Sequence, residues 1–178
     1  ATKLLNHPLG RNVGMRHITI STCGLVPQIQ RLEELGWQLV LAVSLHAATD
    51  ELRTQLMPIN KKYPLSKLIP ACRSYANVTG RRVTFEYALI RGVNDGEKEI
   101  RALVKHLRGW LCHLNLIPLN QVPGLPFKPC SPVEVREFAK KLEKQGIAVT
   151  VRASLGSDVA AACGQLAGGR NHEYSGKN

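Results

Sequence analysis

One cysteine near the end of the chain, Cys163, lies in the segment SDVAAACGQLAGG, among alanines and glycines. A thiol with small neighbours is open to a large substrate, and cysteine is an effective nucleophile once it is deprotonated. Cysteine is also among the most often buried residues and then serves as a small apolar packing group. The segment by itself leaves both interpretations open, a nucleophile and a packing residue.

Polar side chains also stand where several predicted strands end. They are Ser21 and Thr22 after HITI, Ser44 and His46 in VSLH, and Asn115 and Asn120 around LNLIPLN. In parallel α/β sheets and barrels, ligands bind at the carboxyl ends of the strands. Each residue alone could instead cap a helix or hold a turn, but together they favour a binding site. Glu86, inside VTFEYAL, is either a salt-bridge partner or a site carboxylate.

The elements that must position these groups alternate between strands and helices. Strands are expected at 17–21, 39–45, 82–90 and 112–118, with a fifth, peripheral strand near 147–152. The second of them, in LVLAVSLH, is almost continuously apolar, which is typical of a strand buried on both faces of a parallel sheet. Strand–helix alternation with long crossovers predicts a parallel α/β sheet.

The helices between the strands have readable ends. In SPVEVREFAKKLEKQG, Ser131 is the expected N-cap, Pro132 opens the first turn, Glu134 completes a capping box, and Gly146 follows the end. Further helices are expected at 27–36, 49–56, 66–77 and 94–109. We expect one domain over 1–168 and a flexible tail over 169–178, which consists of Gly, Asn and charged residues.

Composition narrows the function classes. The 178 residues carry 24 Lys and Arg against 13 Asp and Glu, a net charge of +11 that favours a polyanionic partner such as nucleic acid. No signal peptide and no apolar run of about 20 residues is present, so we expect a cytoplasmic protein without membrane contact. The five cysteines form no CxxC pair, so neither a disulfide scaffold nor a metal site is predicted.

Several motifs occur together and in order: HITISTCGLVPQI, LAVSLHAATDELRTQLMPINKKYP, VTFEYALIRGVND, HLNLIPLN and DVAAACGQLAG. With them the chain resembles the RlmN/Cfr family of radical-SAM RNA methyltransferases, from about Asn6 to Gly168. The most specific parts are SLHA, MPIN, GVND and AACGQL, the last with Asp158 five residues before the cysteine. The resemblance is closer to the RlmN branch, which methylates C2 of adenine, than to the Cfr branch, which methylates another adenine carbon.

The resemblance implies the C-terminal portion of a radical-SAM partial (β/α)6 barrel with parallel strands and covering helices. It implies S-adenosylmethionine as cofactor, a [4Fe–4S] cluster with an electron donor, and 23S rRNA and tRNA as partners. The family's contacts with S-adenosylmethionine fall on Ser21, Ser44, Leu45, His46 and Asn120. Its methyl-carrying residue falls on Cys163, which becomes an S-methylcysteine whose methyl group is later activated by a deoxyadenosyl radical.

The chain lacks several parts of the family's catalytic machinery. The cluster motif CxxxCxxC is absent, as are the glutamate segment that follows it and the second cysteine of the family mechanism. We therefore expect the chain to be inactive alone and to bind no cluster. Two alternatives remain: a non-catalytic RNA-binding fragment of the family, and a Cfr-like enzyme. An unrelated phosphate-binding α/β enzyme is disfavoured, because no glycine-rich phosphate loop occurs.

Overall fold

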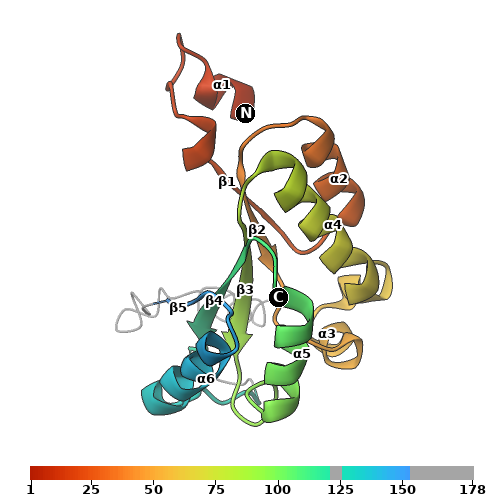
Figure 1. Ribbon diagram of the computed structural model, residues 1–178, viewed down its shortest axis with the longest axis vertical. Helices are drawn as coiled ribbons and strands as arrows, with labels where there is room; N and C mark the ends of the chain where they lie inside the picture. Colours follow the sequence, from red (N-terminus) through yellow and green to blue (C-terminus); the bar gives the residue numbers. More distant parts are fainter. Residues whose placement is uncertain (121–125, 153–178) are drawn as a thin grey trace, which may run out of the picture.

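Parallel strands form the sheet at the centre of the computed structural model, which describes residues 1–120 and 126–152 (Figure 1). The strands are β1 (Thr19–Thr22), β2 (Val40–Ser44), β3 (Val83–Leu89), β4 (Cys112–Pro118) and β5 (Val149–Val151). They are hydrogen-bonded in the order β1-β2-β3-β4-β5, and each neighbouring pair is parallel. The predicted parallel sheet is confirmed, with β5 at its edge.

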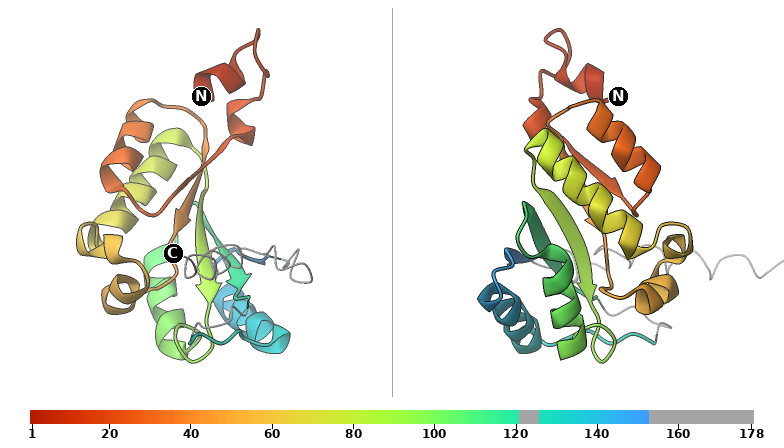
Figure 2. Two further views of the ribbon diagram at one scale, coloured as in Figure 1. Left: turned by 180° about the vertical axis from the view of Figure 1, so that it is seen from behind. Right: turned by 45° about the vertical axis from the view of Figure 1, so that its right-hand side comes forward.

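Helices connect successive strands. They are α1 (Thr2–Asn6), the 3₁₀ helix η1 (Met15–His17), α2 (Val26–Glu34), α3 (Asp50–Leu56), the 3₁₀ helix η2 (Pro58–Lys61), α4 (Leu65–Thr79), α5 (Glu97–Leu107) and α6 (Pro132–Lys144). Because each crossover moves one strand in the same direction, and such crossovers are right-handed, the crossover helices fall on one face of the sheet. Figures 1 and 2 show α2, α4, α5 and α6 on that face. This one-sided winding is that of a barrel wall.

The two faces of β3 show the consequence. Val83, Phe85, Tyr87 and Leu89 are completely buried and belong to the hydrophobic core beneath the helices. The alternate residues of the strand are half-buried. We call the side of the sheet that carries these alternate residues the inner face.

Local sequence signals set the helix ends as expected. At α6, the Ser131 side chain accepts from the Glu134 backbone N–H, and the Glu134 carboxylate accepts from the Ser131 N–H at 2.7 Å. Gly146, just past this helix, has a φ of 81°, in the left-handed region that glycine adopts without strain.

Several predicted bounds differ from the structure by a few residues, and the start of the first strand is one of them. The first strand was expected at 17–21, but it covers Thr19–Thr22 and His17 closes η1. The His17 N–H donates to the Gly14 carbonyl at 2.9 Å, and this local turn removes the residue from the ladder. The predicted boundary between the domain and its tail, at 168/169, lies outside the described residues.

Within the described residues, no helix is long and apolar enough to cross a membrane.

Candidate functional site

The segment Ser44–Leu45–His46 leaves the end of β2 in an unusual conformation. His46 has a φ of 54°, which is rare for a residue with a side chain. The N–H groups of Leu45 and His46 both donate to the Glu86 carbonyl of β3, at 2.9 and 3.2 Å. Strained backbone of this kind persists only where the surroundings hold it, and it is concentrated at functional sites. We call this segment the β2 turn.

Arg53 of α3 fixes the β2 turn through hydrogen bonds to its carbonyl groups. Its guanidinium is completely buried. It donates to the carbonyls of Ser44 at 3.1 Å, Leu45 at 3.2 Å and Cys23 at 3.0 Å. The remaining donors reach Asn60 Oδ1 at 2.9 Å and the Tyr63 carbonyl at 3.5 Å. An arginine has five N–H donors, so this one side chain ties the ends of β1 and β2 to the loop that precedes α4.

The Asn60 amide completes this buried network. Its Nδ2 donates to the carboxylate and carbonyl of Asp50, at 3.0 and 3.1 Å, and to the Thr54 hydroxyl at 2.9 Å. The same Asp50 oxygen accepts from the Leu65 N–H at 2.8 Å, which fixes the start of α4. Burial lowers the pKa of Arg53, while the Asp50 carboxylate opposes that shift. The cation is thus kept in place by a chain of neutral and acidic acceptors.

Asn94 also fixes the β2 turn, through a hydrogen bond to the His46 carbonyl. Its Nδ2 donates to the carbonyls of His46 at 2.9 Å and Ala88 at 2.7 Å, and its Oδ1 accepts from the Ile90 N–H at 2.7 Å. The side chain is fully buried. It therefore joins the carboxyl ends of β2 and β3, the edge at which the sequence predicted a binding site.

The His46 ring has a defined tautomer. Its Nδ1 lies 3.0 Å from the Ala88 N–H and accepts from it, so the neutral ring carries its proton on Nε2. Burial, and to a lesser extent the Arg53 cation, lowers the pKa of His46. At neutral pH the ring is uncharged and presents an N–H donor.

The remaining predicted contacts flank this turn. Ser21 is exposed on β1 and pairs in register with Ala42 of β2. Asn120 is half-buried, two residues beyond β4. Leu45 is completely buried, and both its N–H and its carbonyl are engaged within the protein. Leu45 thus anchors the turn through its backbone groups. Cys163 lies outside the described residues.

Sequence reasoning missed the residues that hold the turn. Arg53 lies on a short polar helix and reads as an exposed charge, yet it is among the most buried side chains. Asn60 and Asn94 stand in the MPIN and GVND segments that carry the family resemblance. Those motifs marked the positions, but only the fold shows that Asn94 bonds the β2 turn directly and that Asn60 accepts from Arg53, which bonds the turn.

Glu86 has the partner that the sequence could not assign. It faces the inner side of β3, opposite Ser44 in register, and its Oε2 accepts from the Asn115 amide at 2.8 Å. In the part of the chain that the structure describes, no salt bridge involves Glu86. The carboxylate lies one strand away from the predicted contact Ser44.

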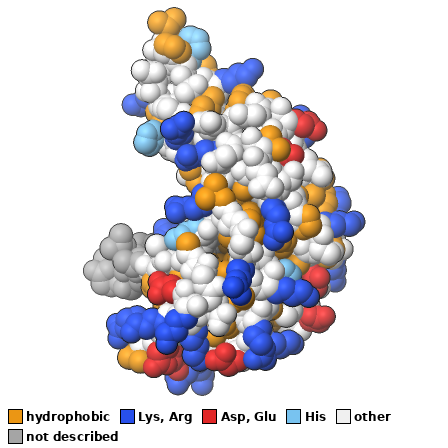
Figure 3. Space-filling view, viewed as in Figure 1, with side chains coloured by type: hydrophobic (Ala, Val, Ile, Leu, Met, Phe, Trp, Pro, Cys, Tyr) orange, Lys and Arg blue, Asp and Glu red, His pale blue; other side chains and the backbone are white. Residues whose placement is uncertain are grey.

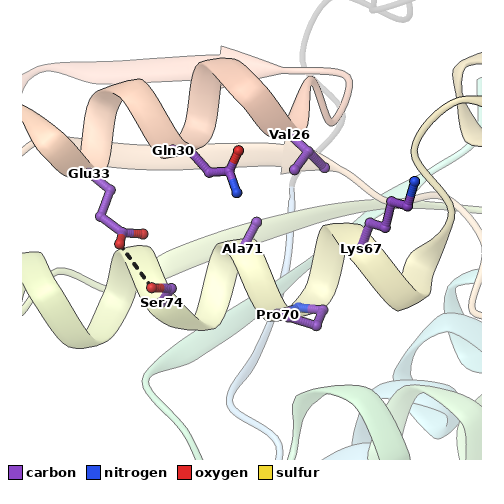
Figure 4. A pocket seen from close by; sticks show the side chains of 7 residues that line it. All are labelled: Val26, Gln30, Glu33, Lys67, Pro70, Ala71 and Ser74. Atoms are coloured by element: carbon purple, nitrogen blue, oxygen red, sulfur yellow. Dashed lines mark hydrogen bonds between the residues drawn. The ribbon is translucent and has the colours of Figure 1, made fainter.

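A separate hollow lies outside the barrel wall, between α2 and α4 (Figure 4). It measures about 410 Å³, is lined by Val26, Ala71 and Pro70 among others, and is crossed by a 2.9 Å hydrogen bond from the Ser74 hydroxyl to Glu33. It is formed by the two helices, on the side of the sheet that the helices cover.

Basic side chains are spread over the surface, and Figure 3 shows them gathered at the lower left, where α6 lies. Basic residues in and near the loops are mostly exposed: Lys61, Lys62, Arg82, Arg91 and Lys128, with Arg81 half-buried. Arg91 pairs with Glu134 at 3.2 Å. Across residues 1–120 and 126–152, no three His, Cys, Asp or Glu side chains are grouped to hold a metal ion.

Comparisons with known proteins agree with this geometry. The family model of the radical SAM superfamily matches residues 2–104. A probable dual-specificity RNA methyltransferase RlmN of Thermoanaerobacter sp. (strain X514) is 54% identical over 164 residues, which is 92% of this chain and 48% of the relative. The corresponding protein of Pelotomaculum thermopropionicum is 56% identical over 165 residues, covering 92% and 45%. The chain thus spans about half the length of the curated relatives it matches.

Solved structures give the same result. A radical SAM methyltransferase from Sphaerobacter thermophilus superimposes with a TM-score of 0.86 at 53% identity, over 90% of this chain and 47% of the other. A domain of pyruvate-formate lyase-activating enzyme from Bacteroides vulgatus has a TM-score of 0.60 at 17% identity, over 76% of this chain and 80% of that one. The second match supports the fold alone.

Proposed function

Because this chain belongs to the radical SAM superfamily, we propose that it forms the S-adenosylmethionine-binding part of an RNA methyltransferase of the RlmN type. The substrate is an adenine of 23S rRNA, and of tRNA, methylated at C2 in the cytoplasm. The single observation that carries the proposal is the β2 turn, a strained backbone segment held by two buried polar side chains at the ligand-binding edge of the sheet.

The chemistry of the β2 turn suits S-adenosylmethionine. Ser44 offers a hydroxyl and His46 a neutral ring with an Nε2–H donor, beside an exposed Ser21 and the half-buried Asn120. These neutral groups match the ring nitrogens and hydroxyls of an adenosyl moiety. When bound, S-adenosylmethionine supplies a methyl group and, after reductive cleavage, a deoxyadenosyl radical. Arg53 and Asn94 keep the turn in one conformation, so binding need not order it.

A [4Fe–4S] cluster does not fit the residues of this chain. Such a cluster takes closely grouped thiolates. The described cysteines Cys23, Cys72, Cys112 and Cys130 lie singly in different parts of the fold, and the sequence has no CxxxCxxC motif. Burial raises the pKa of Cys72 to about 12, which keeps it a thiol. We assign no residue of this chain to the cluster, and the electron donor would act elsewhere in the enzyme.

We assign the methyl-carrying role to Cys163, because the family resemblance puts the methyl-carrying cysteine at this position. The test uses a fusion of this chain to the half of the Thermoanaerobacter relative that it does not match. We expect the fusion to methylate RNA, and mass spectrometry of a peptide spanning residues 153–170 to find an added methylene on Cys163. Cys163→Ala should abolish turnover, whereas Cys130→Ala should keep most of it.

The outcomes separate the alternatives. If the fusion carries its full [4Fe–4S] cluster and binds RNA but transfers no methyl group, the result would favour a non-catalytic RNA-binding protein. Methylation at another adenine carbon would favour a Cfr-like reaction. Turnover by the Cys163→Ala variant would overturn the role of that residue.

A further inference from the structure

A row of polar side chains crosses the inner face of the sheet at the level of the β2 turn. The register pairs Ser44 with Glu86, Glu86 with Asn115, and Asn115 with Thr150, so one residue from each of β2, β3, β4 and β5 stands side by side. Register partners in neighbouring parallel strands point to the same face. We call these four residues the polar row.

The hydrogen bonds of the polar row run in one direction. Asn115 Nδ2 donates to Glu86 Oε2 at 2.8 Å, and the Thr150 hydroxyl donates to Asn115 Oδ1 at 3.2 Å. Because the Thr150 proton is used there, its oxygen accepts from His113 Nε2 at 2.8 Å. Each donor points toward Glu86, which stands at the end of the chain of bonds. The fold therefore directs donors along the row and places a carboxylate at its end.

The row fixes one carboxylate oxygen and leaves capacity for another partner. A carboxylate accepts at both oxygens, and the Asn115 amide takes Oε2. Glu86 is half-buried, so its side chain is accessible from the inner face. It is the acidic residue among the described strands, and its neighbour Ser44 lies about 4.8 Å away, the distance between adjacent strands. A carboxylate beside a serine hydroxyl provides paired acceptors.

We propose that Glu86 accepts a hydrogen bond from the ribose hydroxyls of bound S-adenosylmethionine, an assignment that rests on the proposed function. The two hydroxyls of a ribose each need a partner, and Ser44 and Glu86 offer one apiece from adjacent strands. Asn115, Thr150 and His113 position the Glu86 side chain without touching the ligand.

The experiment measures ligand binding to the 178-residue chain by isothermal titration calorimetry, with S-adenosylmethionine and with 5′-methylthioadenosine. The second ligand keeps the ribose and lacks the amino-acid group. Glu86→Gln still accepts from Asn115 through its amide oxygen but presents a donor in place of the second acceptor. We expect it to weaken binding of both ligands by roughly tenfold or more. Asn115→Ala should weaken both by a smaller factor, because it removes only the positioning bond.

Thr84→Ala is the matched control. Thr84 stands two residues before Glu86 on the same strand, is half-buried, and points to the same face. We expect its affinity to stay within about twofold of the parent chain. Circular dichroism and urea unfolding should show that Glu86→Gln remains folded, since its packing and its bond to Asn115 are retained.

The outcomes distinguish this assignment from the proposed function. If Ser44→Ala weakens binding and Glu86→Gln does not, Glu86 is no ligand contact and the proposed function stands. If Glu86→Gln weakens S-adenosylmethionine alone, the carboxylate contacts the ammonium group and the ribose assignment is overturned. If the parent chain binds neither ligand, both proposals are wrong.

Discussion

The two faces of the sheet differ in burial and in side-chain type. We call the side on which the helices pack the covered face, and it lies opposite the inner face. On the covered face, β3 contributes Phe85 and Tyr87, which have no exposed surface and pack beneath the helices. On the inner face, two residues of the same strand, Thr84 and Glu86, are half-buried, and Glu86 makes a side-chain hydrogen bond to the next strand. One strand thus packs the core with one set of residues and carries polar side chains on its other face. Stability and binding should therefore respond to different substitutions on the same strand.

The largest effect on stability is expected from the covered face. Phe85→Ala removes a ring that packs edge-on against Trp110, with centroids 5.9 Å apart, and leaves a cavity in the core. We expect the free energy of unfolding to fall by about 3–5 kcal/mol in urea titrations. Glu86→Ala, one residue along, should cost less than about 1 kcal/mol. Equal losses at the two positions would contradict the division between the faces.

The free energy of unfolding should be nearly as sensitive to substitutions that remove the support of the β2 turn. Arg53→Lys keeps the charge but cannot reach every acceptor that the guanidinium reaches, so buried carbonyls lose their donors. We expect a loss of about 3 kcal/mol in unfolding free energy. The exposed Arg101 of α5 is the control, and Arg101→Lys should leave unfolding unchanged. A tolerated Arg53→Lys would mean that the β2 turn holds its conformation without the network.

The pH dependence of the unfolding free energy should reflect the protonation of the buried histidine rings. Burial lowers the pKa values of His46, His106 and His113 below 6.5. The unfolded chain therefore binds more protons than the folded one as the pH falls through 6.5, and stability decreases toward acid. His46→Asn, which tolerates the left-handed backbone, should flatten part of this slope between pH 7 and pH 5 in thermal unfolding. An unchanged slope would show that His46 is not a source of it.

The smallest effect is expected at the start of α6. Ser131→Ala removes the side-chain acceptor at the start of α6 and should lower the unfolding free energy by about 1 kcal/mol. Ligand affinity should not change, because this cap stabilises a covering helix and touches neither the β2 turn nor the polar row. A shift in affinity of more than a few-fold would mean that the covered face and the site are coupled.

The sequence by itself determined the elements and their order. Apolar runs such as LVLAVSLH, the capping box at Ser131 and the glycine at 146 act within a few residues, so local energetics decide them, and the parallel sheet follows from the alternation. Together with the motifs, this placed Ser44 and His46 at the carboxyl end of a strand, and the structure has them at the end of β2. The shift of the first strand to Thr19–Thr22 shows the limit, because a single local turn competes with the ladder.

Only the tertiary structure decided what supports that edge. Arg53 finds its acceptors at Cys23, 30 residues away, and at Asn60 and Ser44, and Asn94 reaches His46 across 48 residues. Side chains on α3 and in the GVND segment meet these partners only once β1, β2 and β3 lie side by side. The direction of the polar row likewise depends on Asn115, Thr150 and His113 coming from two strands. A hydrogen bond between distant residues has no local signature, because it is the register of the sheet that brings donor and acceptor together.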